Sequence, residues 1–416
     1  MRRGGWLPGV LLAALLASYG FSAAVSWWLL RHFDFTALQR GGFTVIDPGA
    51  LAGINFRQYF AGRFFVWDAQ WYDVIARVGY VWQPTATERQ SLAFFPLWGL
   101  MLRPIYRLTE VHQHLLAVML TVAIAYAAID QFFRLGVRLI GPRAAAIATV
   151  LYVAYPAAHF LLQSYPTGLM NLIALLVLRD VIDGREWRPA LLAGIGTAAG
   201  PLMVVPGFTV WLVALWRRRE RLLQPRVLLL LLGLGVLALS GLIAFVGWQA
   251  VALHDPFAFL AAQRPWDQSR GLASRLWRFV WMTLILPDFY HIGWLGHDFV
   301  HFMRTGQYFW AFVRFEFAMN FFFRALLMIG LFWTISIKPR AVPLYGVLVM
   351  LFYIFFHGTK HGGFSMMRLI YICAPAFWGL GRALQREPVW AWGTAIMFTL
   401  ALIAQEIFSD IGQLVL

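Results

Sequence analysis

The sequence contains little charge and almost no cysteine. Of its 416 residues only 13% are charged, and Cys373 is the one cysteine. A soluble domain carries about 25% charged residues, so this composition excludes an ordinary water-soluble fold. A single cysteine cannot form an intramolecular disulfide, and it leaves the redox compartment open.

Acidic residues are also scarce, with 19 Asp and Glu against 34 Lys and Arg, which gives a net charge of +15. Much of the arginine lies in short stretches between hydrophobic runs, where basic residues mark the cytoplasmic side of a membrane protein. We therefore interpret the charge as a topology signal and expect no nucleic-acid partner. The sequence also shows no tandem repeat and no low-complexity tract.

Long hydrophobic runs make up much of the chain, and 61% of the residues are hydrophobic. Runs of about 20 residues, enough to cross a bilayer, recur throughout. We predict an all-α polytopic membrane protein, a single integral membrane domain over residues 1–416 with a bundle of about eleven helices. The predicted spans are 7–30, 114–134, 144–163, 168–182, two short helices within 189–216, 226–252, 310–337, 341–357, 366–384 and 388–408. The 189–216 segment is divided at Gly200-Pro201, because proline breaks the helical hydrogen-bond ladder.

Two long segments between the spans are predicted to be extracytoplasmic. The first, residues 31–113, is expected to contain amphipathic or re-entrant helices, and the second is residues 254–309. Met1-Arg2-Arg3 precedes the first span, which places the N-terminus in the cytoplasm. The polar stretches outside the arginine-rich turns then share the outer side, which indicates a site facing away from the cytoplasm.

The stretch from Arg63 to Tyr80 is polar and charged, unlike most of the chain. Its apolar residues recur at helical spacing, which predicts a short amphipathic helix: Trp71, Tyr72, Ile75, Ala76 and Gly79. Asp68 comes at the start of this helix. One interpretation is that Asp68 only caps the free backbone N–H groups there.

A second interpretation follows from the spacing Trp67-Asp68-x-x-Trp71-Tyr72-x-x-Ile75-Ala76-x-x-Gly79-Tyr80. This pattern resembles the signature of the PIG-V family, membrane mannosyltransferases of the GT-C class of glycosyltransferases. Phe94–Leu97, the Asp255-Pro256 segment and Arg368–Pro375 resemble further motifs of that family. The resemblance implies a GT-C-like transmembrane bundle, an inverting transfer of a hexose such as mannose, and a catalytic base at Asp68.

Two family motifs are altered in this chain. Relatives carry a glutamate where Ser164–Gly168 stands here, and an arginine where Ala198–Pro201 stands. The resemblance therefore implies the reaction class more strongly than the sugar or the acceptor.

The implied reaction needs few protein groups. A polyprenyl-phosphate donor already carries a good leaving group, so one carboxylate suffices to take the proton of a lipid or glycan acceptor. Cations must hold the departing phosphate, although cations at an interface can also simply snorkel toward water. The predicted substrate-binding residues are Trp67, Trp71, Tyr72, Gln263, Arg264, Lys360, His361 and Arg368.

Other polar residues have simpler interpretations. Asp73, the rival carboxylate, lies on a different helical face from Asp68, and we predict that it is either solvated or paired with Arg77 four residues later. His297 and His301 have a spacing that can hold a metal, but the glutamate of a zinc-protease motif is absent. We therefore predict no metal site and no cofactor beyond the lipid-phosphate-linked sugar, which is a substrate.

Two other function classes stay open from the sequence. One is a transporter or flippase for a lipid-linked substrate, and the other is a non-catalytic membrane assembly factor with the same fold. Transporters often show internal repeats and charges at the membrane midplane, which this sequence lacks. We expect a multi-pass protein among membrane lipids, in the bacterial cytoplasmic membrane or, in a eukaryote, the endoplasmic reticulum.

Overall fold

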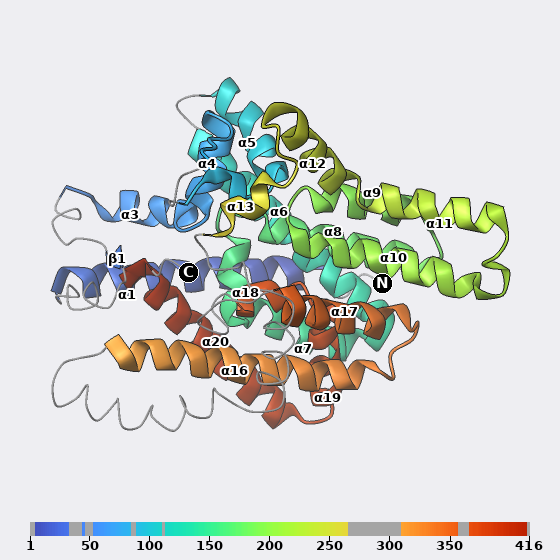
Figure 1. Ribbon diagram of the computed structural model, residues 1–416. Coiled ribbons are helices and arrows are strands. Elements are labelled where there is room, and N and C mark those ends of the chain that lie inside the picture. The colour runs from blue at the N-terminus through green and yellow to red at the C-terminus, as the bar shows by residue number, and fades with distance from the viewer. Residues whose placement is uncertain are drawn as a thin grey trace.

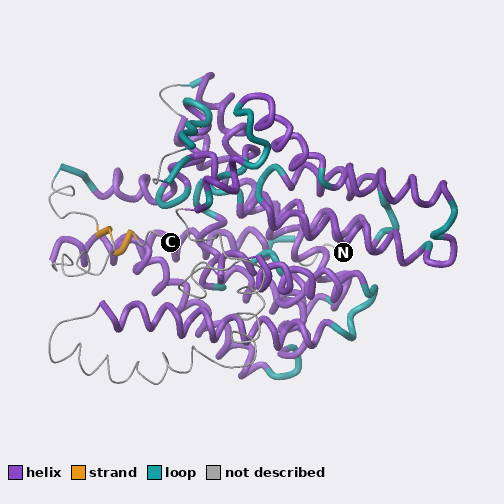
Figure 2. The backbone as a smooth tube through the Cα atoms, in the orientation of Figure 1, coloured by secondary structure: helices purple, strands orange, loops and turns teal. Residues whose placement is uncertain are grey.

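The computed structural model describes residues 5–32, 44–45, 53–84, 89–109, 113–264, 309–356 and 366–413. Almost all of the regular structure in these ranges is helical (Figure 2). The exception is a two-residue antiparallel pairing between β1 (Thr44–Val45) and β2 (Gly412–Gln413). That pairing joins the segment after the first helix to the C-terminal end of the chain.

Three helices in the described residues are long and apolar enough to cross a membrane. They are α1 (Leu7–His32), α6 (Gln113–Ile140) and most of α20 (Pro388–Ile411). A fourth candidate is the pair α11 (Pro225–Ala238) and α12 (Ser240–Ala252), which is bent by 66°. The span predicted at 226–252 thus corresponds to a bent pair of helices that pass the length and composition test together. The finer prediction of about eleven spans stays a prediction.

Other helices, of 11 to 26 residues, fill the space between these candidate spans. They are α7 (Pro142–Ala154), α8 (Thr167–Ile182), α9 (Trp187–Thr197), α10 (Val204–Arg217), α16 (Phe309–Thr334), α17 (Ala341–Phe356) and α19 (Ala374–Leu384). Glycines allow two of them to approach closely: a Cβ atom at Gly379 of α19 would collide with the carbonyl oxygen of Gly330 of α16. Small residues at such crossings are typical of helix packing in membranes.

The chain between α9 and α10 breaks as the proline predicted. Residues 198–203 leave the α-helix, and η5 (Pro201–Met203) forms a 3-10 turn between the two helices. Gly194 and Gly207 lie on the two helices where the α11–α12 bend packs against them, since a Cβ at either glycine would meet that bend. Residues 189–216 are thus two helices.

The arginine-rich turns meet at one end of the bundle. Arg138, at the end of α6, forms an ion pair with Asp183, which follows α8. Arg218, at the end of α10, pairs with Glu186 at 2.7 Å, just before η6 (Arg219–Arg221). Figure 1 shows the α10–α11 turn at the far right, whereas α3 and α4 lie to the left. The molecule therefore has one basic end.

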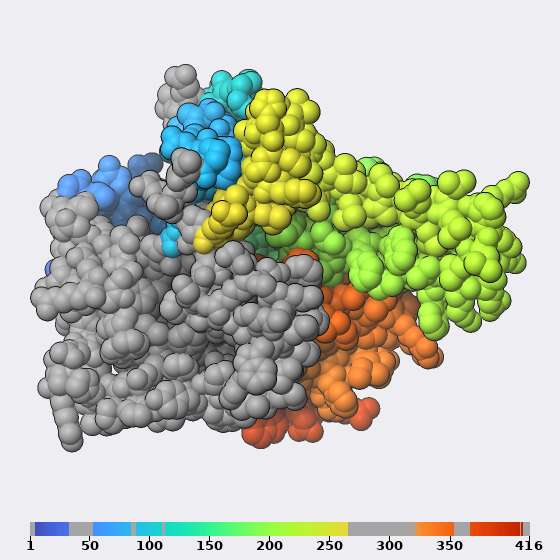
Figure 3. All heavy atoms as spheres, in the orientation of Figure 1, coloured from blue at the N-terminus to red at the C-terminus, as the bar shows by residue number. Residues whose placement is uncertain are grey.

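A layer of short helices covers the bundle away from that end. It consists of α3 (Phe56–Gly62), η2 (Arg63–Phe65), α4 (Ala69–Arg77), η3 (Ser91–Ala93), α5 (Pro96–Leu108) and α13 (Ala258–Ala262). The α4 helix packs on α5, where Gly99 leaves room for Ile75. Figure 3 shows the α3–α4 region and the α12–α13 region side by side on the surface. Two further short elements approach α4 from the bundle, η4 (Pro156–Leu161) and α18 (Met366–Ile370).

Candidate active site

Asp68 occupies the N-cap position of α4, but its side chain makes no capping hydrogen bond. The interpretation of Asp68 as only a helix cap is therefore wrong. Instead, Nη1 of Arg368 donates to Oδ2 of Asp68 at 2.7 Å. The Asp68 side chain is 19% exposed and the Arg368 side chain is 22% exposed. The pair is therefore mostly buried but still accessible to solvent.

The backbone just before Asp68 is strained. Trp67 has φ +62°, a left-handed conformation that a bulky side chain rarely adopts. Such a residue costs about 1–3 kcal/mol and persists only where its surroundings fix it. One fixing contact is the N–H of Asp68, which donates to the Tyr165 hydroxyl at 2.7 Å.

Trp67 also presents an unused donor. Its indole Nε1 is buried and has no hydrogen-bond partner among the described residues. A buried donor of this kind usually finds a partner, and an oxygen of a bound substrate would supply one. This geometry suits the substrate-binding role predicted for Trp67, which stays a prediction.

Aromatic rings hold Arg368 from the other side. Its guanidinium carbon lies 5.3 Å from the centroid of the Phe160 ring and 5.5 Å from that of Tyr165. A cation within about 6 Å of a ring centroid is attracted to the ring face. The segment after η4 is in turn tied to the polar layer, because the N–H of Ser164 donates to the Phe64 carbonyl at 2.7 Å. Arg368, Tyr165 and Asp68 thus form one connected unit.

The tyrosines beside Asp68 are neutral hydrogen-bonding groups. Burial raises the pKa of Tyr72 above its usual value, and the Asp68 carboxylate raises it further. Burial and, to a lesser extent, the Asp68 carboxylate also raise the pKa of Tyr165. Both phenols therefore stay protonated at any physiological pH and cannot act as bases.

A second cation lies within electrostatic reach of Asp68. Burial lowers the pKa of the Arg89 guanidinium, and the Asp68 carboxylate opposes that shift. Neither Arg89 nor Tyr165 is among the predicted site residues, and Tyr165 lies within the altered motif Ser164–Gly168. No local pattern marks either residue, because both reach Asp68 through the tertiary fold.

The remaining predicted residues are placed differently. Trp71 stacks on Phe94, with ring centroids 5.8 Å apart, and Tyr72 packs edge-on against the same ring. The Gln263 amide donates to the Ala93 carbonyl at 2.6 Å and so joins α13 to η3. Arg264 is exposed. Lys360 and His361 lie outside the described residues, and all these substrate-binding roles stay predictions.

The prediction for Asp73 is confirmed. Nε of Arg77 donates to Oδ2 of Asp73 at 2.7 Å, and His114 lies 3.8 Å from the other oxygen. Asp73 is therefore engaged away from the Asp68–Arg368 pair. His297 and His301 fall outside the described residues, and within those residues no three potential metal ligands come together.

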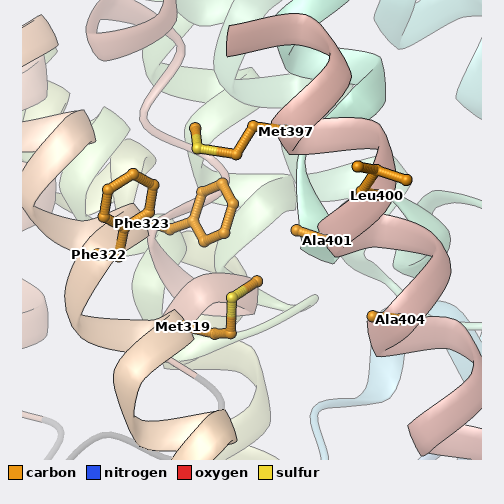
Figure 4. A pocket seen from close by; sticks show the side chains of 7 residues that line it. All are labelled: Met319, Phe322, Phe323, Met397, Leu400, Ala401 and Ala404. Carbon is orange, nitrogen blue, oxygen red and sulfur yellow. The ribbon is translucent and has the colours of Figure 1, made fainter. Parts of the chain in front are cut away.

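An apolar groove opens between α16 and α20, apart from the residues around Asp68 (Figure 4). Its volume is about 370 Å³, and its lining is Met319, Phe322, Phe323, Met397, Leu400, Ala401 and Ala404. None of these side chains carries a group that could bind a sugar hydroxyl or a phosphate. This groove therefore offers no polar group for a sugar or phosphate.

Comparison with known proteins gives one family match. A family model described as Mannosyltransferase (PIG-V) matches residues 46–235. The matched region contains Asp68, Arg89 and Tyr165, and it ends before Arg368.

Among solved structures, the chain is similar to ArnT from Cupriavidus metallidurans in the apo state. The two share 14% sequence identity, and the likeness covers 99% of this chain and 78% of that chain with a TM-score of 0.35. A TM-score of this size does not establish a shared fold. No curated protein matches the chain.

Proposed function

Because a family model described as Mannosyltransferase (PIG-V) matches residues 46–235, we propose that Asp68 and Arg368 form the centre of a sugar transfer. The protein is a membrane glycosyltransferase. In the proposed reaction a sugar passes from a polyprenyl-phosphate donor to a lipid or glycan acceptor on the extracytoplasmic face, with inversion at the anomeric carbon.

One observation supports this proposal above all, the 2.7 Å contact between the Asp68 carboxylate and the Arg368 guanidinium. Transfer from a lipid phosphate needs an acceptor for the hydroxyl proton and a cation for the leaving phosphate. The fold brings one group of each kind together from positions 300 residues apart. The other ion pair of α4, Asp73 with Arg77, joins residues four positions apart and brings no distant group into the layer.

The bond changes follow from these positions. The acceptor oxygen attacks the anomeric carbon, and its proton moves to the Asp68 carboxylate. The bond between that carbon and the phosphate oxygen breaks, and its electron pair leaves with the phosphate. Arg368, with Arg89 nearby, balances the added negative charge on the phosphate.

The ion pair also suggests an order of binding. Nη1 of Arg368 donates to Asp68, and the same N–H cannot also bind a phosphate oxygen. A donor phosphate that takes up Arg368 would release the Asp68 oxygens for the acceptor hydroxyl. We therefore expect donor to bind before acceptor.

The test is Asp68→Asn, with Asp73→Asn as the matched control on the same helix. Loss of a general base lowers the rate about 10²–10⁴-fold, while donor binding and membrane insertion should persist. Asp73→Asn alters the contacts of Asp73 with Arg77, His114 and Tyr106, away from Arg368, and should keep most of the activity. Transfer of labelled sugar by the purified protein is the measurement, and a wild-type rate in Asp68→Asn would refute the assignment.

The same assay separates the two other function classes. A transporter or flippase would move a lipid-linked substrate without transferring sugar, and an assembly factor would do neither. Sugar transfer that depends on Asp68 is expected only of the enzyme.

A further inference from the structure

We propose that the buried ion pair between Arg63 and Asp410 positions Asp68 for the reaction. Arg63 and Asp410 are positioning residues, since neither is expected to touch the substrate. The inference rests on the proposed function of Asp68, and its test is arranged so that the two can fail separately.

The ion pair lies deep in the protein. Nε of Arg63 donates to Oδ1 of Asp410 at 2.7 Å, and the two side chains are only 3% and 5% exposed. Nη2 of Arg63 donates to the Ser22 hydroxyl at 3.1 Å, and Nη1 donates to the Tyr19 carbonyl. The guanidinium also lies 4.1 Å from the centroid of the Tyr19 ring. Each of its three nitrogens thus donates to a residue of α1 or α20.

Asp410 is equally well held. Its second oxygen accepts from the Ser26 hydroxyl at 2.5 Å, and Ser26 lies 2.8 Å from the Tyr59 hydroxyl of α3. The pair therefore ties the first and last long helices to the polar layer. A buried charge whose partner is removed is left uncompensated, which is strongly unfavourable, so each residue depends on the other.

Arg63 lies close to Asp68 in the sequence. Arg63 begins η2, and only Val66 and Trp67 separate the end of η2 from Asp68. The Arg63 carbonyl accepts from the Tyr19 hydroxyl at 2.7 Å, and the next carbonyl accepts from the N–H of Ser164. Asp68 is fixed at the other end of this short segment by Tyr165. The left-handed backbone of Trp67 lies between these two anchors, and a strained residue needs such anchors to persist.

Glu406 provides a matched control. It lies one turn before Asp410 on α20, is 1% exposed, and accepts from the Ser18 hydroxyl of α1 at 3.3 Å. Its charge acts on Arg63 through space, but in the described part of the chain no hydrogen bond joins the two side chains. Glu406→Gln therefore removes a charge near Arg63 and leaves the hydrogen-bonded contact with Asp410 in place.

The first experiment compares sugar transfer by Asp410→Asn and Glu406→Gln. A displacement of about 1 Å at a reacting group can lower a rate about 100-fold, so Asp410→Asn should lose about 10- to 100-fold in kcat. KM for the donor should change less than about twofold, because Arg368 is untouched. Glu406→Gln should stay within about threefold of wild type, and Asp410→Glu should recover part of the loss. Equal losses in the asparagine and glutamine variants would overturn the proposal.

The second experiment places Asp410→Asn in an Asp68→Asn background. Effects of residues that act through one group are not additive, so the double variant should be no slower than Asp68→Asn alone. A further 10-fold loss in the double variant would show that Asp410 acts on the fold in general. If Asp68→Asn alone transfers sugar at the wild-type rate, the proposed function fails, whatever the anchor does.

A milder variant covers the case in which Asp410→Asn does not fold. Ser22→Ala removes one hydrogen bond of Arg63 without leaving a charge unpaired. We expect a loss of about threefold to tenfold in kcat with unchanged donor KM, while Ser18→Ala, beside Glu406, stays at the wild-type rate. Equal rates for the two serine variants would contradict the positioning role.

Discussion

Arg368 has two kinds of partner at once. It donates to the Asp68 carboxylate at 2.7 Å, and its guanidinium plane lies near the faces of Phe160 and Tyr165. A guanidinium can stack on rings and still present N–H groups in its own plane, whereas the ammonium of lysine cannot do both. The site therefore requires arginine for its shape as well as its charge.

We expect Arg368→Ala to weaken use of the donor by about 10- to 150-fold, since a charge-assisted contact contributes about 1.5–3 kcal/mol. Arg368→Lys should recover only part of this loss. The measurement is kcat/KM for the lipid-phosphate donor, with Arg77→Ala on α4 as the control cation. Unchanged donor dependence in the folded alanine variant would show that Arg368 is structural.

Tyr165 should act as a fixed neutral group. Burial and the Asp68 charge both raise its pKa well above the usual value near 10. The same two causes raise the pKa of Tyr72. The phenol therefore keeps its proton as the pH rises through about 10. A rate–pH profile measured up to that pH should show no fall from ionisation of either tyrosine, and a tyrosine limb near pH 10 that disappears in Tyr165→Phe would contradict this.

At the scale of elements, the contact between α16 and α19 depends on two glycines. Gly330 and Gly379 bring the two backbones so close that a Cβ on either would meet a carbonyl oxygen of the other helix. The α19 helix begins three residues after α18, which carries Arg368. Backbone atoms cannot move aside as a flexible side chain can.

Gly379→Ala should therefore destabilise the protein by about 1–3 kcal/mol or more, the cost of overpacking. The control is Gly393→Ala in α20, where nothing lies within 4 Å of the added Cβ. Alanine in that helix interior should be neutral or stabilising by about 0.5–1 kcal/mol. Thermal unfolding in detergent measures both, and equal midpoints for the two variants would refute the close contact.

At the scale of the whole molecule, the arginine-rich turns and the Asp68–Arg368 pair lie in different parts of the structure. The arginine-rich turns meet through the Arg138–Asp183 and Arg218–Glu186 pairs, whereas the Asp68–Arg368 pair belongs to the layer of short helices. Basic turns mark the cytoplasmic side of a membrane protein. We therefore place the site on the outer side, as a proposal.

Cysteine labelling from each side tests this placement. An impermeant reagent should react from outside with cysteines at Gln90 and Gln263, and only from inside with one at Arg219. Thr359, in the turn between the predicted spans 341–357 and 366–384, is also expected on the outer side, but it lies outside the described residues. Outside labelling of position 219 would overturn both the orientation and the assignment of the outer face.

Local sequence determined much of the element structure. The apolar spacing of Tyr72, Ile75 and Ala76 predicted α4, and these residues are buried on one face of it. Gly200-Pro201 predicted the break between α9 and α10, and the i,i+4 spacing predicted the Asp73–Arg77 pair. All of these depend on residues within a few positions of each other, where helical periodicity and proline chemistry act directly.

Only the tertiary structure decided which distant residues meet. Asp68 and Arg368 were predicted singly, but their contact joins residues 300 positions apart, and that of Arg63 with Asp410 joins residues 347 apart. The bend between α11 and α12 and the left-handed Trp67 also went unpredicted. Such features depend on how whole helices pack, and a favourable distant contact leaves no periodic trace in the sequence that surrounds either partner.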